Sequence, residues 1–468
     1  MVTSRVGRSR PLSGHQQAIT VVFLAAFVAY VLWADIRWAS LDAWALVVFY
    51  GAVAVVTFGT MVAGTQWRRF AHLPPATGRI IAIVPVYNEA PAYVMETILS
   101  LASQTIPPDE IHVIDDGSVD PVVAFDHPLV HWHRQENEGK RHAQAKVLRE
   151  SRRAEWDFVL TVDSDSVPDA DAVEHLLRSM SNPKVQAATG MILMRNWRDN
   201  LLTRLVDINV ITTCLTFRMI RSWLGIVSPT SGALALYRAA VVYDNLDDYV
   251  SSGTVGDDRR LSFYALLRGE VVGVSEAVVE THLPSTFSGT FQQRLRWSKS
   301  AWLGIPFVST NLRPLAVLFY IFPLAFTLMW PFVVLMLARV SYLYDKPALL
   351  YGLLYWEVVA IAMTGICSVY RPDFTLTEKL QMWALAPLYP ILGAVLLRPA
   401  AFWALTQLRS QAWHTRESVP PAAPLAAPVL ALVPRQRGPS DLEVPGVAME
   451  AEPAGMAQSR VTGRRRFR

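Results

Sequence analysis

Cysteine is scarce in this sequence, with only two residues among 468. Cys214 and Cys367 lie far apart in apolar surroundings, and the chain has no Cys-x-x-Cys pair. The ten histidines likewise show no spacing that is typical of metal ligands. These absences give no support to a disulfide framework or to a zinc site. We expect both cysteines to be buried as small hydrophobic residues.

Charged residues are also few, at 18% of the chain against 52% hydrophobic residues, and the net charge is only +4. No stripe of basic residues suggests a nucleic-acid partner. The chain has neither a G-x-S-x-G elbow nor a Walker loop, so acyl transfer and ATP-driven transport have no support. The arginines gather at the termini and beside apolar blocks, as the positive-inside rule for membrane proteins predicts.

The apolar residues are concentrated in blocks, which predicts membrane spans. Residues 18–34 could form the core of a signal peptide, but they are long enough to span, lack a convincing cleavage site and precede a second span at 43–64. Arginines before the first span and after the second place both flanks in the cytosol. The region from about 75 to 305 is therefore expected to be cytosolic.

Further spans are predicted at 315–338 and 348–370. Residues 382–397 are shorter and contain two prolines, which suggests a kinked span or a re-entrant segment. We favour the re-entrant segment, because a span would place the basic residues that follow it outside the cell. The predicted division is a basic segment 1–17, two transmembrane helices in 18–70, a cytosolic domain 71–305, membrane helices in 306–417, and an Ala/Pro-rich disordered tail 418–468.

The cytosolic region alternates apolar strands with helical patterns. Strands are predicted at 80–84, at 111–114 directly before Asp115 and Asp116, and at 158–162 directly before Asp163. This order predicts an α/β domain with a mostly parallel sheet. Ligands bind beyond the carboxyl ends of such strands, so the acidic motifs lie where an active site is expected. Residues 199–224 predict an interfacial amphipathic helix or, alternatively, a helix packed on the sheet.

Several polar motifs suggest phosphate and sugar chemistry, although each has a structural alternative. Asp163 and Asp165 suit Mg²⁺ or Mn²⁺, but Asp165 or Ser166 could instead cap a helix. Asp257 and Asp258 could supply a base, or could begin a helix. Lys140 and Arg141 could bind phosphate, or could simply be solvated. Trp297 could pack in a core, whereas the adjacent Gln293 and Arg296 are harder to explain in that way.

Taken in order, the motifs resemble those of the processive family 2 glycosyltransferases, especially hyaluronan and chitin synthases. The resemblance covers residues 78–305. It rests on Val-Pro-Val-Tyr-Asn-Glu at 84–89, Asp-Asp-Gly-Ser at 115–118, Gly-Lys-Arg-His-Ala-Gln at 139–144, Asp-Ser-Asp at 163–165, Ser-Gly at 231–232, Gly-Asp-Asp-Arg at 256–259 and Gln-x-x-Arg-Trp at 293–297. Trp-His-Thr-Arg at 413–416 is similar to a gate element of these enzymes.

The resemblance implies a GT-A-type domain and a role for each motif residue. The donor side would consist of Tyr87, Asp115, Asp116, Lys140 and Asp163 around the nucleotide, with Asp165 as ligand of Mg²⁺ or Mn²⁺. On the acceptor side Asp258 would be the general base, beside Asp257. Gln293, Arg296 and Trp297 would lie on an interfacial helix, with Arg296 facing the diphosphate and Trp297 at the acceptor entrance.

The implied activity is polymerisation of UDP-sugars into a β-linked polysaccharide at the plasma membrane, with the catalytic domain facing the cytosol. UDP-GlcNAc together with UDP-GlcA would give a hyaluronan-like polymer, and UDP-GlcNAc alone a chitin-like one. Ala233 departs from the family pattern, and Arg260 occupies a position that varies within the family. The resemblance therefore does not decide between the two polymers. The complete set of carboxylates disfavours a non-catalytic scaffold, and the Gln-x-x-Arg-Trp motif disfavours a non-processive glycolipid transferase.

Overall fold

The computed structural model describes residues 68–252, 256–344, 347–371 and 373–408. The predicted segment 1–17, the predicted spans at 18–34 and 43–64, the motif at 413–416 and the tail at 418–468 lie outside these residues. Both cysteines are described, and both are buried as predicted.

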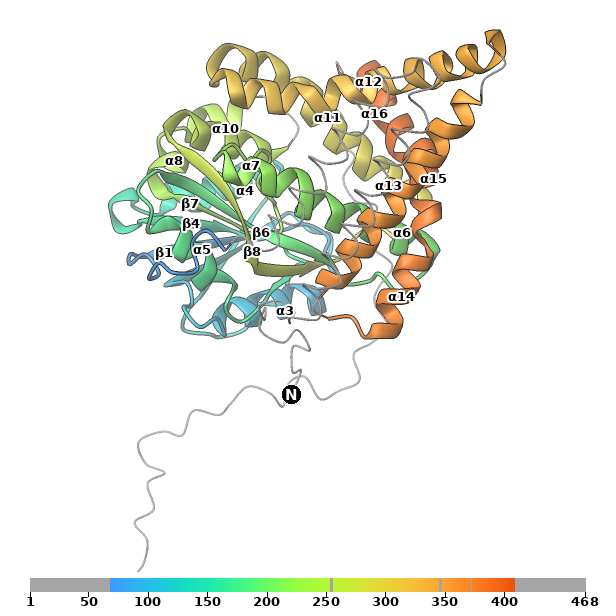
Figure 1. Cartoon of the computed structure of the whole chain (residues 1–468). Helices are drawn as coiled ribbons and strands as arrows, with labels where there is room; N and C mark the ends of the chain where they lie inside the picture. The colour runs from blue at the N-terminus through green and yellow to red at the C-terminus, as the bar shows by residue number, and fades with distance from the viewer. Residues whose placement is uncertain (1–67, 253–255, 345–346, 372, 409–468) are drawn as a thin grey trace, which may run out of the picture. The chain divides into compact units, whose positions relative to one another are not determined.

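An eight-stranded sheet in the order β3-β2-β1-β4-β7-β6-β8-β5 forms the centre of the domain (Figure 1). Its parallel part joins β3, β2, β1 and β4, while β7 runs antiparallel to both β4 and β6. The predicted strands are confirmed in a mixed α/β sheet with more parallel than antiparallel pairings. The strands are β1 Ile80–Val86, β2 Glu110–Asp116, β3 Val130–Gln135, β4 Phe158–Thr161, β5 Ser166–Pro168, β6 Val185–Met194, β7 Ala235–Arg238 and β8 Glu270–Thr281.

Helices cover both faces of the sheet, which explains why the central strands are apolar along their whole length. Every residue of β1 is buried. Alternate residues of β1 point to opposite cores, so that Ala82 and Val84 pack with α3 and α5 while Ile81 and Ile83 pack with α4, α8 and α10. These helices are α3 Pro91–Ala102, α4 Lys140–Glu150, α5 Ala172–Met180, α8 Ala239–Tyr243 and α10 Asp257–Arg268; the short α9 is Leu246–Ser251.

Helix α6, Leu201–Thr213, is packed between the sheet and a membrane helix. It begins with a capping box between Asn200 and Thr203, and continues through a π-helical turn at Cys214–Arg218 into α7, Met219–Trp223. Val206 and Ile208 share a core with Val359 and Ile366. For α6 the structure therefore matches the alternative prediction, a helix packed on the sheet. Phe217, Trp223 and Leu224, farther along the segment 199–224, are exposed, so an interfacial position for that part of the segment stays a prediction.

Among the described residues, three helical segments are long and apolar enough to cross a membrane: α12 Pro314–Leu343, α13 Ala348–Tyr370 and the run Leu376–Thr406. The third comprises α14 Leu376–Ala384, α15 Tyr389–Leu392 and α16 Arg398–Thr406, joined by a 3₁₀ turn at Ala386–Leu388 and a π turn at Gly393–Leu397. The segment predicted at 382–397 is thus the middle of a longer run. Its length is therefore sufficient for a span, and the preference for a re-entrant segment, which rests on the basic residues after it, stays a prediction.

A buried ion pair fastens α13 to the sheet domain. The guanidinium of Arg371 donates to Asp207 Oδ1 and to Asp373 Oδ2, each at 3.0 Å, and to the carbonyl of Met194 at 3.4 Å. The side chains of Arg371 and Asp207 have no exposed surface. Burial raises the pKa of Asp207 to about 6 even though Arg371 lowers it. This pair joins α6, the end of β6 and the end of α13.

Replacing Arg371 with methionine should destabilise the protein, because Asp207 would keep a buried charge without its cation. We expect Arg371→Met to lower the free energy of unfolding by about 3–5 kcal/mol in denaturant melts of the detergent-solubilised chain. Arg149→Met removes an exposed partner of Asp247 and should cost less than about 1 kcal/mol. Equal losses in the two variants would contradict a stabilising role for the buried pair.

Candidate active site

The acidic motifs meet at the carboxyl edge of the parallel strands. Asp115 and Asp116 are the last two residues of β2, and Asp163 follows β4 within two residues. β1 lies between β2 and β4 and ends directly before Tyr87. Parallel strands end at the same edge of a sheet, so the three motifs are brought together as the sequence predicted.

Asp116 and Asp115 organise the loops around this edge. The carboxylate of Asp116 is buried and accepts from Gln135 Nε2 at 2.7 Å and from the backbone N–H groups of Glu138 and Gly139 at 3.1 and 2.9 Å. Asp115 accepts from the N–H of Ser118 at 2.8 Å and pairs with Arg134 at 3.0 Å. Both carboxylates therefore shape the pocket wall, and a direct contact with the nucleotide base stays a prediction.

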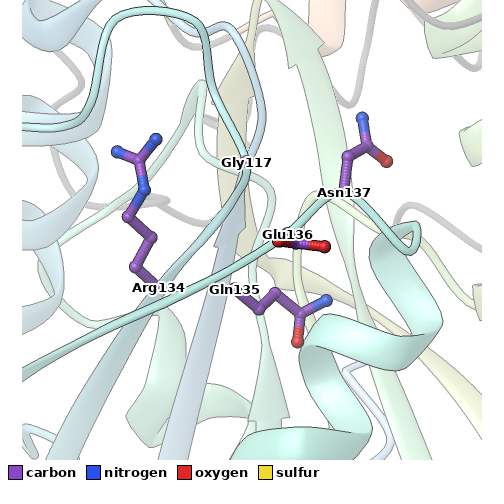
Figure 2. Close-up of a pocket in the computed structure, with 5 residues that line it drawn as sticks. All are labelled: Gly117, Arg134, Gln135, Glu136 and Asn137. Atoms are coloured by element: carbon purple, nitrogen blue, oxygen red, sulfur yellow. The ribbon is translucent and has the colours of Figure 1, made fainter.

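An open hollow of about 510 Å³ adjoins these carboxylates and is lined by Gly117 and residues 134–137 (Figure 2). In Figure 2 the side chains of Arg134 and Gln135 point to opposite sides of the strand, and Gly117 faces the loop that contains Asn137. Gly117 has a φ of +75°, and a Cβ there would lie 2.6 Å from the backbone nitrogen of Asn137. The close approach of these two loops thus requires glycine.

Tyr87 lies at the same edge of the sheet, directly after β1. Asn88, which follows it, donates its N–H to Ser118 Oγ and accepts from the N–H of Val119 through Oδ1, both at 2.9 Å. These bonds tie the loop after β1 to the loop after β2. They hold Tyr87 next to the loop that lines the hollow.

Lys140 joins the two halves of the site. Its Nζ lies 2.6 Å from Asp163 Oδ1 and 2.7 Å from Asp257 Oδ2. Burial opposes the charge on Lys140, but the two carboxylates outweigh it and raise the pKa of this lysine. Burial also raises the pKa of Asp257, and Lys140 reverses this so that the net shift is downward. The ammonium group thus holds the carboxylates of Asp163 and Asp257 together.

Asp257 and Asp258 form the first turn of α10, where the helix dipole stabilises negative charge. The predicted helix start is confirmed and is compatible with a catalytic role. Gly256 precedes them with a φ of +104°, and a Cβ on it would lie 2.3 Å from Ser300 Oγ. Burial and the neighbouring charge of Asp257 raise the pKa of Asp258 to about 6. Asp258 is therefore ionised at neutral pH yet basic enough to accept a proton.

Asp165, two residues after Asp163, is buried. Its Oδ1 accepts from Thr281 Oγ1 at 3.2 Å and Ser166 Oγ at 3.4 Å. The alternative prediction, that Asp165 or Ser166 caps a helix, is wrong because Ser166–Pro168 form β5 and the next helix begins at Ala172. Asp163 and Asp165 thus both lie in the short connection between β4 and β5.

Gln293, Arg296 and Trp297 lie on one helix, α11, which spans Phe287–Asn311. With Ser300 they occupy positions i, i+3, i+4 and i+7, which share one face. Ser300 Oγ accepts from Arg259 Nε at 2.9 Å and abuts Gly256. The face that presents the motif is therefore turned toward the start of α10, where Asp258 lies, and the side chain of Trp297 is 39% exposed.

The glycosyl transferase family 2 model matches residues 81–246, which include the motifs from Tyr87 to Gly232. A hyaluronan synthase of Streptococcus pyogenes is 31% identical over 367 residues, which cover 74% of this chain and 85% of that protein. The chain belongs to glycosyltransferase family 2. With three apolar helices in the part that the structure describes, it is a membrane glycosyltransferase that uses a UDP-sugar.

A second relative aligns with more of the chain. An N-acetylglucosaminyltransferase of Azorhizobium caulinodans is 28% identical over 420 residues, which cover 86% of this chain and 99% of the relative. Among solved structures, TarS residues 1–349 of S. aureus are 16% identical and cover 73% of this chain and 94% of that one, with a TM-score of 0.36.

Two residues beside the site of this family 2 enzyme, His282 and Arg294, were not predicted from the sequence. The pairing of Ser166 with Thr281 in the β5–β8 ladder places Asp165 beside His282, the next residue outward. Arg294 lies over the ring of Trp297 at 4.5 Å, and its buried Nε and Nη2 have no hydrogen-bond partner among the described residues. Burial lowers the pKa of Arg294 to about 10. Arg294 could have been noticed from the sequence, because it is a second basic residue within the Gln-x-x-Arg-Trp motif, at its first x position. The position of His282 beside Asp165 depends on strand register, which the sequence does not show.

Proposed function

We propose that this family 2 enzyme is an inverting, processive glycosyltransferase that polymerises UDP-sugars into a β-linked polysaccharide and passes it across the membrane. The observation that supports this most directly is the bridge from Asp163 through Lys140 to Asp257. It joins the donor-side loop after β4 to the turn that contains Asp258. A nucleotide-binding edge and a carboxylate base are thereby held in one site.

The donor would bind with its uracil in the hollow beside Gly117, between Tyr87 and the loop that Asp116 organises. Lys140 would line the same pocket and Asp163 would contact the nucleotide. The hollow opens at the carboxyl end of β2, where nucleotides bind in open α/β sheets. The bonds from Asp116 to the 135–139 loop suggest that its contribution is to fix the shape of this pocket.

A hard divalent cation, Mg²⁺ or Mn²⁺, fits the residues around the diphosphate position. Asp165 supplies carboxylate oxygens, the ligands that such cations prefer, and Thr281 and Ser166 orient this carboxylate. His282 lies beside it and would be a second ligand. Bound there, the cation would neutralise charge on the departing diphosphate. Arg296 would add its guanidinium to the same charge.

Asp258 would take the proton of the acceptor hydroxyl as that oxygen attacks the anomeric carbon. The attack comes from the face opposite to the diphosphate, so one displacement converts an α-linked donor into a β-linked product. No covalent intermediate with the enzyme is required. Trp297, partly exposed on the adjacent helix, would offer its ring to the acceptor sugar at the entrance.

The neighbouring apolar helices would let the product leave through the bilayer. α11 is followed after two residues by α12, and α16 packs on α11 through Trp302 and Ala404. The motif helix is thus continuous with the membrane part. We propose that the catalytic domain faces the cytosol at the plasma membrane, because the donors are cytosolic and the basic flanks favour this orientation.

The donor set has two candidates. Hyaluronan-like polymerisation from UDP-GlcNAc and UDP-GlcA is our first choice, supported by the 31% identity to a hyaluronan synthase. Polymerisation of UDP-GlcNAc alone is the alternative, supported by the longer alignment with an N-acetylglucosaminyltransferase. Either donor set would use the same base and the same diphosphate site.

A comparison of donors distinguishes these candidates. The purified chain in lipid nanodiscs with Mn²⁺ would receive labelled UDP-GlcNAc alone or together with UDP-GlcA. We expect polymer only from the mixture, degradable by hyaluronidase and not by chitinase. Polymer from UDP-GlcNAc alone would replace the first choice with the chitin-like alternative. Release of UDP with only single sugars transferred would contradict processive synthesis.

A further inference from the structure

Three histidines and two glutamates cluster at the outer edge of the sheet, away from the catalytic carboxylates. His112 lies on β2, and His131 and His133 lie on the edge strand β3. Glu110 begins β2, and Glu150 ends α4. Glu110 is six residues before Asp116 on the same strand, a separation of roughly 20 Å at about 3.3 Å per residue. No role in the transfer reaction is assigned to these residues.

The strand register places the side chains on one face. His112 pairs with His131, and His133 pairs with Ile114, two residues beyond His112. Side chains two residues apart in a strand point the same way, so all three rings lie together. The ring of His112 stacks on those of His131 and His133, with centroids 4.9 and 5.1 Å apart. His112 itself is 8% exposed.

We propose that Glu110, His112 and His131 bind a transition-metal ion of the Zn²⁺ class that fastens the edge strand β3 to β2. Their ligand atoms all lie within 4.8 Å of one another. Glu110 Oε2 is 2.9 Å from His112 Nε2 and 3.9 Å from His131 Nε2. Ligands of tetrahedral Zn²⁺ lie roughly 3.3 Å apart, given bonds of about 2.0–2.1 Å, so small side-chain shifts would complete the site, with water as a fourth ligand.

His133 and Glu150 lie where the outer partners of a zinc-bound histidine are expected. His112 Nδ1 lies 2.8 Å from His133 Nε2, and His133 Nδ1 lies 3.4 Å from Glu150 Oε2. If each ring donates toward Glu150, His112 Nδ1 is protonated and its Nε2 lone pair points at Glu110. This carboxylate–histidine relay fixes the tautomer that a metal needs.

The charged side chains around the cluster do not prevent a cation from binding there. Arg79 approaches the other oxygen of Glu110 at 3.4 Å and lies 3.9 Å from Asp109, while Lys146 pairs with the other oxygen of Glu150 at 2.7 Å. Each glutamate thus has one oxygen toward a cationic side chain and the other toward the rings. With Asp109 included, the carboxylates of the cluster outnumber its basic side chains by one.

Zinc binding by the full chain in nanodiscs tests the proposal. Zn²⁺ would be titrated calorimetrically in excess Mg²⁺, in an Asp165→Asn background so that the catalytic carboxylate does not contribute. We expect a single Zn²⁺ per chain. His131→Ala, which changes a half-exposed side chain, should abolish this binding, and His133→Gln should weaken it about 10- to 100-fold by removing the outer relay. The exposed His72→Ala should bind as the parent does.

Spectra with Co²⁺ add a readout that does not depend on folding yield. A tetrahedral nitrogen and oxygen site should give visible absorption in the parent and none in His131→Ala. Absence of stoichiometric Zn²⁺ binding would overturn the proposal. Binding that persists in His131→Ala would also overturn it, because the ion would then lie elsewhere.

Discussion

Asp258→Asn should lower the rate of sugar transfer by about 10²- to 10⁴-fold, the loss expected when a general base is removed. Asparagine has nearly the same shape as aspartate but cannot accept the hydroxyl proton. The donor pocket is formed by other residues, so UDP should bind to the variant with unchanged affinity in calorimetry. The measurement is the initial rate of UDP release by the purified chain with saturating donors.

The pH profile shows whether this loss comes from the base itself. The pKa of Asp258 is raised to about 6 by burial and by Asp257. Only the ionised form accepts a proton, so wild-type activity should rise with pH through about 6 and reach a plateau near neutrality. The residual activity of Asp258→Asn should lack this rise. The exposed Asp247→Asn serves as the matched control and should keep both the rate and the profile. A variant with wild-type polymer synthesis would remove Asp258 from the role of base.

Asp165→Asn should lower transfer by about 10²-fold or more at a fixed Mn²⁺ concentration, and should raise the Mn²⁺ concentration needed for half-maximal activity. The buried carboxylate is oriented by Thr281 and Ser166, and the amide would replace one charged oxygen with a hydrogen-bond donor. The measurements are activity across an Mn²⁺ titration and Mn²⁺ binding by electron paramagnetic resonance. Removal of the metal with a chelator should abolish the wild-type activity reversibly.

A conservative change at an exposed aspartate provides the comparison for Asp165. Asp126→Asn alters a solvent-exposed carboxylate after β2 and should leave the Mn²⁺ titration unchanged. If Asp165→Asn and the wild type required the same Mn²⁺ concentration, Asp165 would not be the ligand. If the chelator had no effect on the wild type, the reaction would not depend on a divalent cation.

The sheet could be predicted because its central strands are covered on both faces. Strands such as β1 have no solvent-exposed face, so their sequence is a continuous run of apolar residues without alternation. The acidic residues at the end of β2 and shortly after β4 then locate the active edge of the sheet. Asp163 and Asp165 could be placed at that edge from sequence alone. Their partners could not, because Lys140 reaches Asp257 across 117 positions of the chain and Thr281 reaches Asp165 only through the β5–β8 register.

Features that depend on tertiary contacts were predicted less well. The helix α6 has apolar residues on the face that a membrane would cover, and the sequence could not show that α13 already packs there. The segment at 382–397 looked short because its prolines break the apolar pattern, whereas turns at Ala386–Leu388 and Gly393–Leu397 let the helical run continue. Histidines 112, 131 and 133 showed no ligand spacing because two strands, and not one segment, bring them together.

The proposal that this chain builds a polysaccharide is tested most directly by product length in a reconstituted bilayer. Purified full-length chain in nanodiscs would receive UDP-GlcNAc, UDP-GlcA and Mn²⁺, and labelled product would be sized by gel electrophoresis alongside the amount of UDP released. We predict long polymer already at low turnover, with one sugar incorporated for every UDP released. Products of one or a few sugars that lengthen only gradually, or UDP release without polymer, would contradict processive synthesis.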